Sequence, residues 1–162
     1  MPVLDAAEAR RRFTAARVAR LATLDPAGRP HQVPVVFARH SAVGADGADG
    51  ADGADRIVTA VDHKPKSTVR LRRLANIAAH PSVCLLVDVY DEDWDRLWWA
   101  RADGEARILH PDPDDPDVWR SYATAVAALC AKYPQYRDRP PSGPVVAVTV
   151  DRWSGWEARP DG

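Results

Sequence analysis

The sequence is poor in cysteine and long apolar runs, and each scarcity argues against a class of protein. The two cysteines, Cys84 and Cys130, follow no Cys-x-x-Cys or Cys/His ligand spacing, which argues against a zinc ribbon or a disulfide framework. No apolar run approaches the about 18 residues of a membrane-spanning helix, and the first residues have no signal-peptide pattern. The net charge of −1 provides no overall basic field for nucleic acid. We therefore expect a cytoplasmic protein with neither a membrane nor a nucleic-acid partner.

Common nucleotide-binding and catalytic motifs are absent as well. The chain has no Gly-x-Gly-x-x-Gly loop, no Gly-x-x-x-x-Gly-Lys-Ser/Thr loop and no Gly-x-Ser-x-Gly elbow. Its five histidines are scattered without a metal-ligand spacing, so no metal site is predicted. The sequence thus predicts no catalytic residue, and any enzymatic chemistry is expected to belong to a bound cofactor.

Lysine is scarce too, and its distribution is informative. Only three lysines occur beside 19 arginines, and two of them, Lys64 and Lys66, lie in one tetrapeptide, while the third is Lys132. A β-rich run, Ile57–Val61, precedes the tetrapeptide, and a helical pattern follows it. The start of a helix presents free backbone N–H groups and the positive end of the helix dipole, both of which favour an anion.

The same junction offers hydroxyl donors beside the two ammonium groups. Ser67 and Thr68 follow Lys66 directly, at the start of the predicted helix. The segment therefore predicts a phosphate-binding site formed by Lys64, Lys66, Ser67 and Thr68. The alternative is that both lysines are ordinary solvated residues of a surface loop.

The order of the elements favours a mainly β fold in one domain over residues 1–162. Strands are predicted at 18–24, 30–38, 56–62, 82–89, 97–109 and 144–151, and helices at 6–16, at 69–79 and after the acidic loop 112–117. Because the strands are mostly consecutive, the pattern indicates an antiparallel sheet or barrel with packed helices rather than a Rossmann fold. Asp5 predicts the cap of the first helix, and Gly104 predicts a bulge or a sharp bend.

Two helices carry apolar stripes that predict their buried faces, and one stretch has no pattern. The second helix is expected to bury Leu71, Leu74, Ala75 and Ala78, and the third to bury Trp119, Tyr122, Ala123, Val126 and Leu129. Arginines 70, 72 and 73 lie largely off the first of these stripes. Residues 133–141 are expected to be irregular.

Residues 44–55 form four tandem Gly-Ala-Asp triplets. Calcium-binding repeats need a nine-residue period with alternating apolar positions, which the triplets lack. We expect a flexible acidic loop that joins the second and third strands.

Several side chains could contact a flat heterocycle. Gln32, on the second strand, could bond the edge of a ring, and Arg20, on the first, could reach a phosphate; the alternative for both is a solvent-facing position. Tryptophans at the start of the predicted strand 97–109 and near the C-terminus, among them Trp98 and Trp153, could form the wall of such a site or simply pack in the core.

Taken together, these segments resemble a known family. Residues 18–36 are similar to the opening hairpin of the pyridoxamine 5′-phosphate oxidase-like split β-barrels of the flavin-reductase type, and residues 63–67, 71–77 and 80–88 continue the resemblance in order. Tyr90, Trp94 and residues 97–106 are similar to the F420-dependent oxidoreductase branch of this class.

The resemblance implies a six-stranded antiparallel split β-barrel that forms a homodimer, with two cofactor sites at the dimer interface. The cofactor would be coenzyme F420, with FMN as the alternative. Lys64, Lys66 and Ser67 correspond to the phosphate site, Gln32 and Thr59 lie on strands that border the ring, and Trp98 or Trp153 could close the site from the other subunit.

The implied activity is hydride transfer between the deazaflavin and a small unsaturated or quinone-like molecule. Two alternatives stay open: a non-catalytic carrier of F420 or FMN, and an FMN-dependent oxidase of the pyridoxamine-phosphate type.

Overall fold

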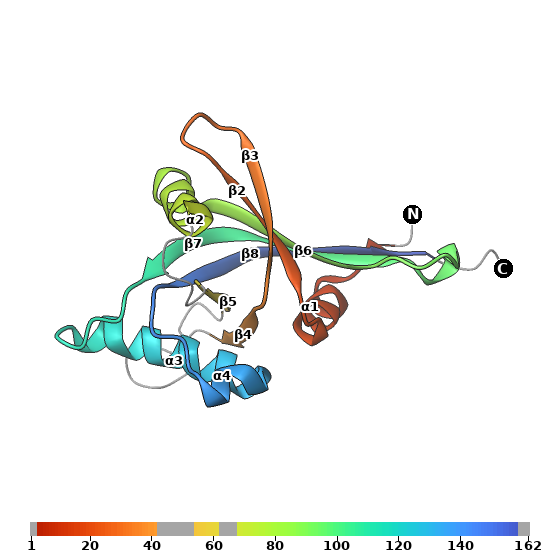
Figure 1. The fold of residues 1–162 in the computed structure, drawn as a ribbon. Coiled ribbons are helices and arrows are strands. Elements are labelled where there is room, and N and C mark those ends of the chain that lie inside the picture. Colours follow the sequence, from red (N-terminus) through yellow and green to blue (C-terminus); the bar gives the residue numbers. More distant parts are fainter. Residues whose placement is uncertain (1–2, 42–53, 62–67, 159–162) are drawn as a thin grey trace.

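A computed structural model describes residues 3–41, 54–61 and 68–158 of the chain. Its centre is one antiparallel sheet crossed by helices on both sides (Figure 1). The strands are β1 (Val3–Leu4), β2 (Ala19–Leu24), β3 (Pro30–Val35), β4 (Ala38–Ser41), β5 (Asp55–Ala60), β6 (Ser82–Val89), β7 (Trp98–Leu109) and β8 (Val145–Glu157). The helices are α1 (Ala6–Ala15), α2 (Thr68–Ala79), α3 (Pro116–Lys132) and α4 (Pro134–Asp138), with a 3₁₀ turn, η1, at Trp94–Arg96.

The strand order explains the shape of the sheet. Seven strands follow the order β3-β2-β6-β7-β8-β5-β4, and β1 pairs with β8. The two edge strands, β3 and β4, are separated in sequence only by Val36 and Phe37. The sheet must therefore curl until its opposite edges meet at these two residues, as a split β-barrel does. The described edges are joined by the chain and not by a ladder of β3–β4 hydrogen bonds.

The mainly β fold class is confirmed, while the expected number of elements is too small. Sequence patterns predict about six strands and three helices, and the described residues form eight strands and four α-helices. The predicted strand 30–38 divides at Val36–Phe37, where the chain changes from one edge of the sheet to the other. The elements β1 and α4 are too short, at two and five residues, to show a periodicity.

The expected Gly-Ala-Asp loop at 44–55 is too long by its last residue. Residues 42–53 lie outside the described part, but Asp55 is buried and begins β5, where it pairs with Ser41. Its carboxylate accepts hydrogen bonds from Arg39 and from the Trp153 indole. Because these partners lie far from Asp55 in sequence, the triplet pattern alone could not separate it from the repeat.

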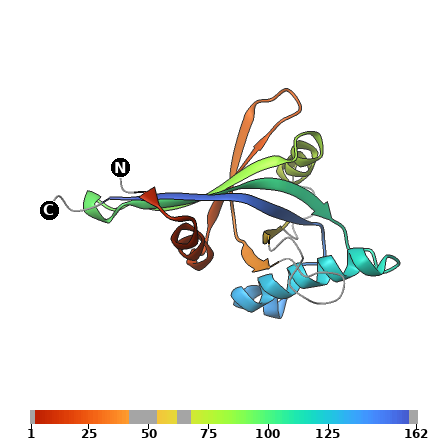
Figure 2. The same ribbon diagram turned by 180° about the vertical axis from the view of Figure 1, so that it is seen from behind.

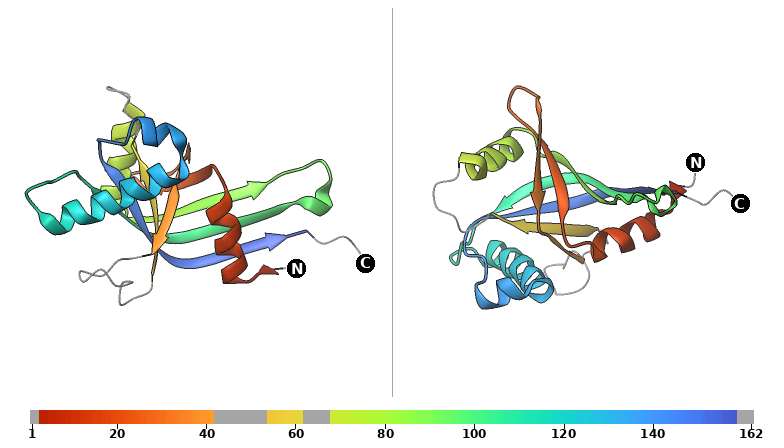
Figure 3. Two further views of the ribbon diagram at one scale, coloured as in Figure 1. Left: turned by 90° about the horizontal axis from the view of Figure 1, so that it is seen from below. Right: turned by 45° about the vertical axis from the view of Figure 1, so that its right-hand side comes forward.

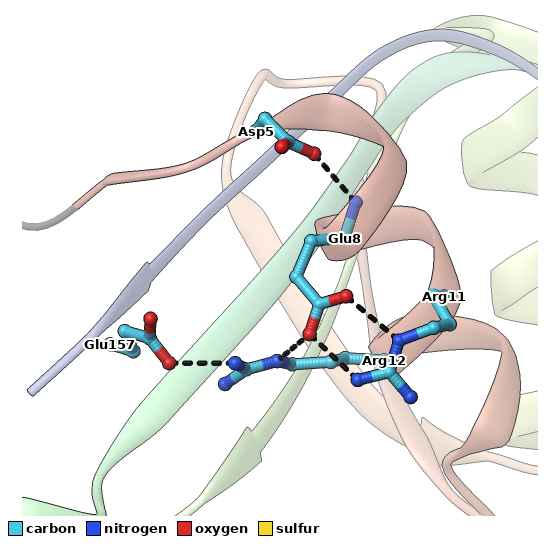
Figure 4. Close-up of polar contacts among 5 residues, drawn as sticks. All are labelled: Asp5, Glu8, Arg11, Arg12 and Glu157. Carbon is cyan, nitrogen blue, oxygen red and sulfur yellow. Dashed lines mark hydrogen bonds and ion pairs between the residues drawn. The ribbon is translucent and has the colours of Figure 1, made fainter.

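Helix α1 begins as its sequence predicts (Figure 4). The Asp5 side chain accepts a hydrogen bond from the backbone N–H of Glu8 at 2.8 Å, which satisfies one of the free donors at the helix start. The Glu8 carboxylate binds Arg11 and Arg12 instead of returning to Asp5, and these hydrogen bonds lower the pKa of Glu8 to about 2. Arg12 also donates to Glu157, near the end of β8, at 2.6 Å (Figure 4).

Two apolar clusters lie on opposite sides of the sheet. The first fills the curled sheet beneath α1, where the Phe13 and Phe37 rings are 4.9 Å apart. The second lies between the sheet and α3, which Figures 1 and 2 show on the side of β4 and β5. There Tyr122 and Leu129 pack with Val58 and Val145.

Both predicted helix stripes are partly wrong. In α3, Trp119 and Ala123 are exposed, and the buried residues are Tyr122, Ala125 and Leu129. The helix meets the sheet along the side of Ala125, whose small side chain permits close packing, so the larger Trp119 is left outside.

In α2, Ala75 and Ala78 are exposed, whereas Asn76 and Ile77 are buried. The side chain of Leu71 lies outside the described residues. A polar Asn76 inside the contact with the sheet breaks the apolar pattern from which the buried face was predicted.

Gly104 confirms the predicted bulge in β7. The pairing of β7 with β8 shifts between Asp103 and Gly104. A Cβ atom at Gly104 would lie 2.0 Å from the Thr149 carbonyl oxygen, so only glycine fits this approach of the two strands.

Within the described residues, no helix is both long and apolar enough to cross a membrane.

Candidate functional site

A pocket of about 360 Å³ opens where β5 ends and α2 lies beside the sheet. Its size falls within the range of ligand-binding pockets. It is lined by Val18, Pro34, Val35, Val36, Thr59, Ala60, Arg73 and Tyr136. These residues come from the edge strand β3 and the link that follows it, from β5 near the other edge, from the segment before β2, and from α2 and α4, so the curling of the sheet creates the pocket. Figure 3 shows α2 and α4 at different sides of β5.

Thr59 is a polar residue in a strand that is otherwise apolar at this end. Its neighbours Val58 and Ala60 are buried, and Thr59 itself is 1% exposed. Across the described part of the chain, its hydroxyl makes no hydrogen bond. Its position in the pocket wall suits a ligand that accepts or donates a hydrogen bond.

Among the described residues, Arg73 is the cationic group of the pocket lining. It lies in the second turn of α2 and is partly buried. The helix is fixed to the sheet by Asn76, whose side-chain amide donates to the Thr23 hydroxyl at 3.0 Å in a buried contact. This hydrogen bond sets the rotation of α2 and thereby the position from which Arg73 reaches the pocket.

On the side of the pocket opposite Arg73, Tyr133 fixes the position of the chain. Its hydroxyl oxygen accepts the Phe37 N–H at 3.1 Å and lies 2.9 Å from the carbonyl oxygens of Phe37 and Arg17. Burial raises the pKa of the Tyr133 phenol, so it keeps the proton that it donates to one carbonyl. This group fixes the chain next to Val36, where the sheet changes edge, and the Tyr136 ring packs 5.9 Å from the Tyr133 ring.

The structure describes the side chains of several predicted site residues, and one of these residues lines the pocket. Thr59 lines it. Gln32 is exposed on β3, two residues before Pro34, and does not line the pocket. Thr68 is the first residue of α2, whereas Lys64, Lys66 and Ser67 lie outside the described residues, in the segment that connects β5 to α2.

Trp98 lies elsewhere in the same chain. It lines a second, more open pocket of about 580 Å³ between α1 and the start of β7. The Arg12 guanidinium lies 5.4 Å from the centre of its ring, a cation–π distance. Val18 lines both pockets, which therefore lie on either side of the segment that leads into β2.

Trp153 is packed against the core. Its ring meets Phe13 edge-on at 5.3 Å between centroids, and its indole N–H donates to Asp55 at 3.1 Å. A single chain therefore brings Thr59 together with Arg73, and places Gln32, Trp98 and Trp153 outside that pocket.

Arg73 and Tyr136 are pocket residues that the sequence did not indicate. Arg73 lies off the apolar stripe and resembles any surface arginine of a helix. Tyr136 belongs to the one-turn helix α4 in a stretch that was expected to be irregular. The described residues contain no group of three or more His, Cys, Asp or Glu side chains that could hold a metal ion.

The family model for pyridoxamine 5′-phosphate oxidase matches residues 6–157. The chain belongs to this family. No curated protein matches the sequence in the comparison. Among solved structures, a FAD-binding protein from Mesorhizobium loti is similar at a TM-score of 0.63 and 21% identity, with 96% of each chain covered.

Two structures from Mycobacterium smegmatis are also similar. One is a FAD-binding protein, at a TM-score of 0.57 and 15% identity, with 97% of this chain and 98% of that chain covered. The other is a heme-binding protein, at a TM-score of 0.57 and 19% identity, with 94% of this chain and 54% of that chain covered. At these identities the likeness concerns the fold.

Proposed function

We propose that the chain is an oxidoreductase that binds a phosphate-bearing flavin or deazaflavin in the Thr59 pocket. The observation that carries this proposal is the composition of the pocket among the described residues: apolar walls with the hydroxyls of Thr59 and Tyr136 and the guanidinium of Arg73. Flat, mostly apolar cofactors are held by such walls, with a few polar groups that fix their orientation. Membership of the pyridoxamine 5′-phosphate oxidase family supports the same conclusion.

The phosphate of the cofactor is assigned to the segment that follows β5. Lys64, Lys66, Ser67 and Thr68 connect the strand that carries Thr59 to the helix that carries Arg73. The two ammonium groups and the start of α2 would neutralise a phosphate, and Arg73 would add a charge from the next turn of the helix.

The ring of the cofactor is assigned to the walls formed by Val18, Val35 and Val36, with the Thr59 hydroxyl at its polar edge. When bound, a flavin or deazaflavin supplies the hydride chemistry. The chain's own residues would orient the ring and exclude water. Thr59, Arg73 and Tyr136 are the pocket's polar side chains among the described residues, and none of them transfers a proton readily at neutral pH.

The resemblance of the sequence favours coenzyme F420, and the similar structures favour a flavin nucleotide, because two of them bind FAD. F420 remains our specific hypothesis for hydride delivery to a small unsaturated or quinone-like molecule, with FMN as the alternative. A non-catalytic carrier of the same cofactor would need the same pocket residues.

A second copy of the chain is proposed to complete the site. Trp98 is the better candidate to reach a partner subunit, because Trp153 is already bound within its own chain by Asp55 and Phe13. Tyr90 and Trp94, which are 80% and 71% exposed at the tip between β6 and β7, add apolar surface of the kind that homodimers bury.

The proposal is tested by fluorescence or absorbance titration of the apo-protein with F420, FMN, FAD and heme. We expect binding of F420 or a flavin at micromolar concentration or tighter. Lys64→Ala with Lys66→Ala should weaken it by about 2–4 kcal/mol, since charge-assisted contacts are lost. Arg152→Gln, an exposed arginine of β8, is the matched control and should bind like the unaltered chain.

Turnover then separates an enzyme from a carrier. Oxidation of the bound, reduced cofactor by a panel of quinones and enones would support the enzyme, and tight binding without any turnover would support the carrier. Binding of heme alone, or of none of the four ligands, would refute the cofactor assignment.

A further inference from the structure

The pocket between the end of α1 and the beginning of β7, here called the Trp98 cleft, has the features of a second binding site. Its volume is about 580 Å³, within the range of sites for small molecules. The described chain forms its walls mainly from apolar side chains: Ala15, Ala16, Val18, Val89 and Trp98. Val18 and Val89 are 42% and 40% exposed, so the walls present apolar surface to solvent.

The register of the sheet explains why these residues converge. Val89, the last residue of β6, pairs directly with Trp98, the first residue of β7, and directly paired residues project from the same face of a sheet. Helix α1 lies against β7 and β8 (Figure 3), and its Arg12 guanidinium lies 5.4 Å from the centre of the Trp98 ring. The cleft is therefore the space between the end of α1 and the paired ends of β6 and β7.

Among the described residues, four charged side chains line the cleft, and three of them have partners of opposite charge. Arg11 and Arg12 both bind the Glu8 carboxylate at 2.7 Å (Figure 4). Asp88 binds Arg20 at 3.2 Å. The charges of these three lining residues are thus compensated within the chain.

Arg17 is the fourth charged residue of the lining, and no carboxylate of the described residues binds it. Its exposed guanidinium donates to the Lys132 carbonyl oxygen at 3.1 Å and lies 4.8 Å from the centre of the Tyr133 ring. Because a guanidinium group has five N–H donors, Arg17 can still bind another acceptor. Burial, and after it the positive charge of Arg17, lower the pKa of the Lys132 ammonium to about 8, as a nearby charge without a counter-ion does.

We propose that the Trp98 cleft binds a small molecule with a planar apolar body and one carboxylate group. The body would pack against Val18, Val89 and Trp98, and an aromatic ring would gain additional attraction from the indole. The carboxylate would accept parallel hydrogen bonds from Arg17, since the planar fork of a guanidinium matches the geometry of a carboxylate. One anionic group suits the cleft, because the other lining charges are already compensated.

This site is separate from the Thr59 pocket and does not depend on the proposed function. Of the described residues, only Val18 lines both pockets. The cationic side chains differ as well, because Arg73 lines the Thr59 pocket and Arg17 lines the Trp98 cleft. Substitution of one arginine or the other therefore shows which of the two pockets a carboxylate occupies.

Calorimetric titration of the full chain with 2-naphthoate tests the site, and 2-naphthamide, an uncharged molecule of nearly the same shape, is the reference. We expect the unaltered chain to bind the carboxylate about tenfold or more tightly than the amide. Arg17→Gln should reduce this preference to about twofold or less, and Arg17→Lys should restore part of it. Arg96→Gln, which alters an exposed arginine of η1, is the matched control and should keep the full preference.

Val89→Thr tests the apolar wall without a change in the charge of the cleft. The substitution keeps the shape of an exposed side chain but adds a hydroxyl group, so it should weaken both probes by a similar factor of about three or more. A carboxylate preference that is lost in Arg73→Gln and kept in Arg17→Gln would place the probe in the Thr59 pocket and overturn the assignment.

Two further results would also overturn it. The first is an unaltered chain that binds neither probe, or binds both equally. The second is an affinity for 2-naphthoate that falls as the chain associates in sedimentation experiments at increasing protein concentration, because a second copy of the chain would then occupy the cleft.

Discussion

The Lys132 ammonium lies 3.7 Å from the centre of the Phe37 ring, at the place where the curled sheet changes edge. It also donates to the carbonyl oxygens of Ala16 at 2.6 Å and Thr14 at 3.2 Å. The end of α3 is thereby joined to the end of α1. Burial, with a smaller contribution from the positive charge of Arg17, lowers the pKa of Lys132 to about 8.

This lowered pKa predicts a pH dependence of stability. Between about pH 8 and pH 10.5, folded Lys132 has lost its proton while the unfolded chain still binds one, so stability rises with pH in this window. Below pH 8 both states are protonated and the contribution is constant. We expect the free energy of unfolding of the unaltered chain, relative to Lys132→Met, to increase from pH 8 to 9.5.

Urea unfolding of both proteins at half-unit pH steps from 7 to 9.5 measures this difference. The upper limit keeps the buried phenols, whose pKa values are raised, outside the range. Parallel curves for the two proteins would show that Lys132 titrates normally in the folded chain.

Tyr133→Phe removes the hydroxyl that joins Phe37 to Arg17. The buried N–H of Phe37 loses its partner, which costs about 1–3 kcal/mol of stability. The variant should also bind the proposed cofactor more weakly, because Val36 and Tyr136 line the pocket beside the lost contact. Chemical unfolding and ligand titration measure the two effects, and a variant that keeps both values unchanged would contradict the role assigned to this hydroxyl.

The contact between Asn76 and Thr23 is suited to a double-mutant cycle. Asn76→Ala removes the buried amide that donates to the Thr23 hydroxyl and should cost about 2–3 kcal/mol, partly by leaving that hydroxyl unpaired. Thr23→Val should cost less in the Asn76→Ala background than alone, by at least about 0.5 kcal/mol. Additive losses would mean that the hydrogen bond contributes nothing beyond the separate packing of each residue.

Gly104→Ala should be among the most damaging small substitutions in the chain. Its Cβ would lie 2.0 Å from the Thr149 backbone oxygen, and separating β7 from β8 at this point should cost about 2–4 kcal/mol. Gly28→Ala is the comparison: Gly28 has a φ of +80° but open space around it, so only the backbone strain of about 1 kcal/mol is expected. Thermal unfolding compares the stability of the two variants, and an equal loss of stability in both would contradict the close approach at Gly104.

Shortening the Gly-Ala-Asp repeat should leave the fold intact. Ser41, before the repeat, pairs in the sheet with Asp55, its last residue, and the entropy of closing a loop depends only weakly on its length. Deletion of residues 47–52 is expected to change the melting temperature by less than about 2 °C, because two triplets alter the closure term by about half a kcal/mol. A larger fall in melting temperature would show that the repeat contributes specific contacts.

Local features could be predicted from the sequence because their causes are local. The Asp5 cap depends on the backbone three residues away, and the bulge at Gly104 depends on a missing side chain. Thr59 was predicted from the family resemblance, and the structure places it in the wall of the pocket.

The remainder of the site depends on tertiary packing. The face that Arg73 presents depends on how α2 packs on the sheet, with Asn76 bonded to Thr23, and a buried asparagine breaks the apolar pattern by which helix faces are predicted. Tyr136 enters the pocket through a single helical turn that has no periodicity. Trp119 appeared to belong to an apolar stripe, but it is exposed because α3 approaches the sheet along Ala125.

The position of β8 in the sheet has a consequence for synthesis of the chain. This last strand lies between β7 and β5, so the portions β3-β2-β6-β7 and β5-β4 have no hydrogen-bonded connection until it is made. A nascent chain that ends before Val145 exposes the unpaired edges of β7 and β5, and unpaired edges are sites of aggregation. These edges should stay unpaired until β8 has been made, and folding should be slow, since the central strand pairs are distant in sequence.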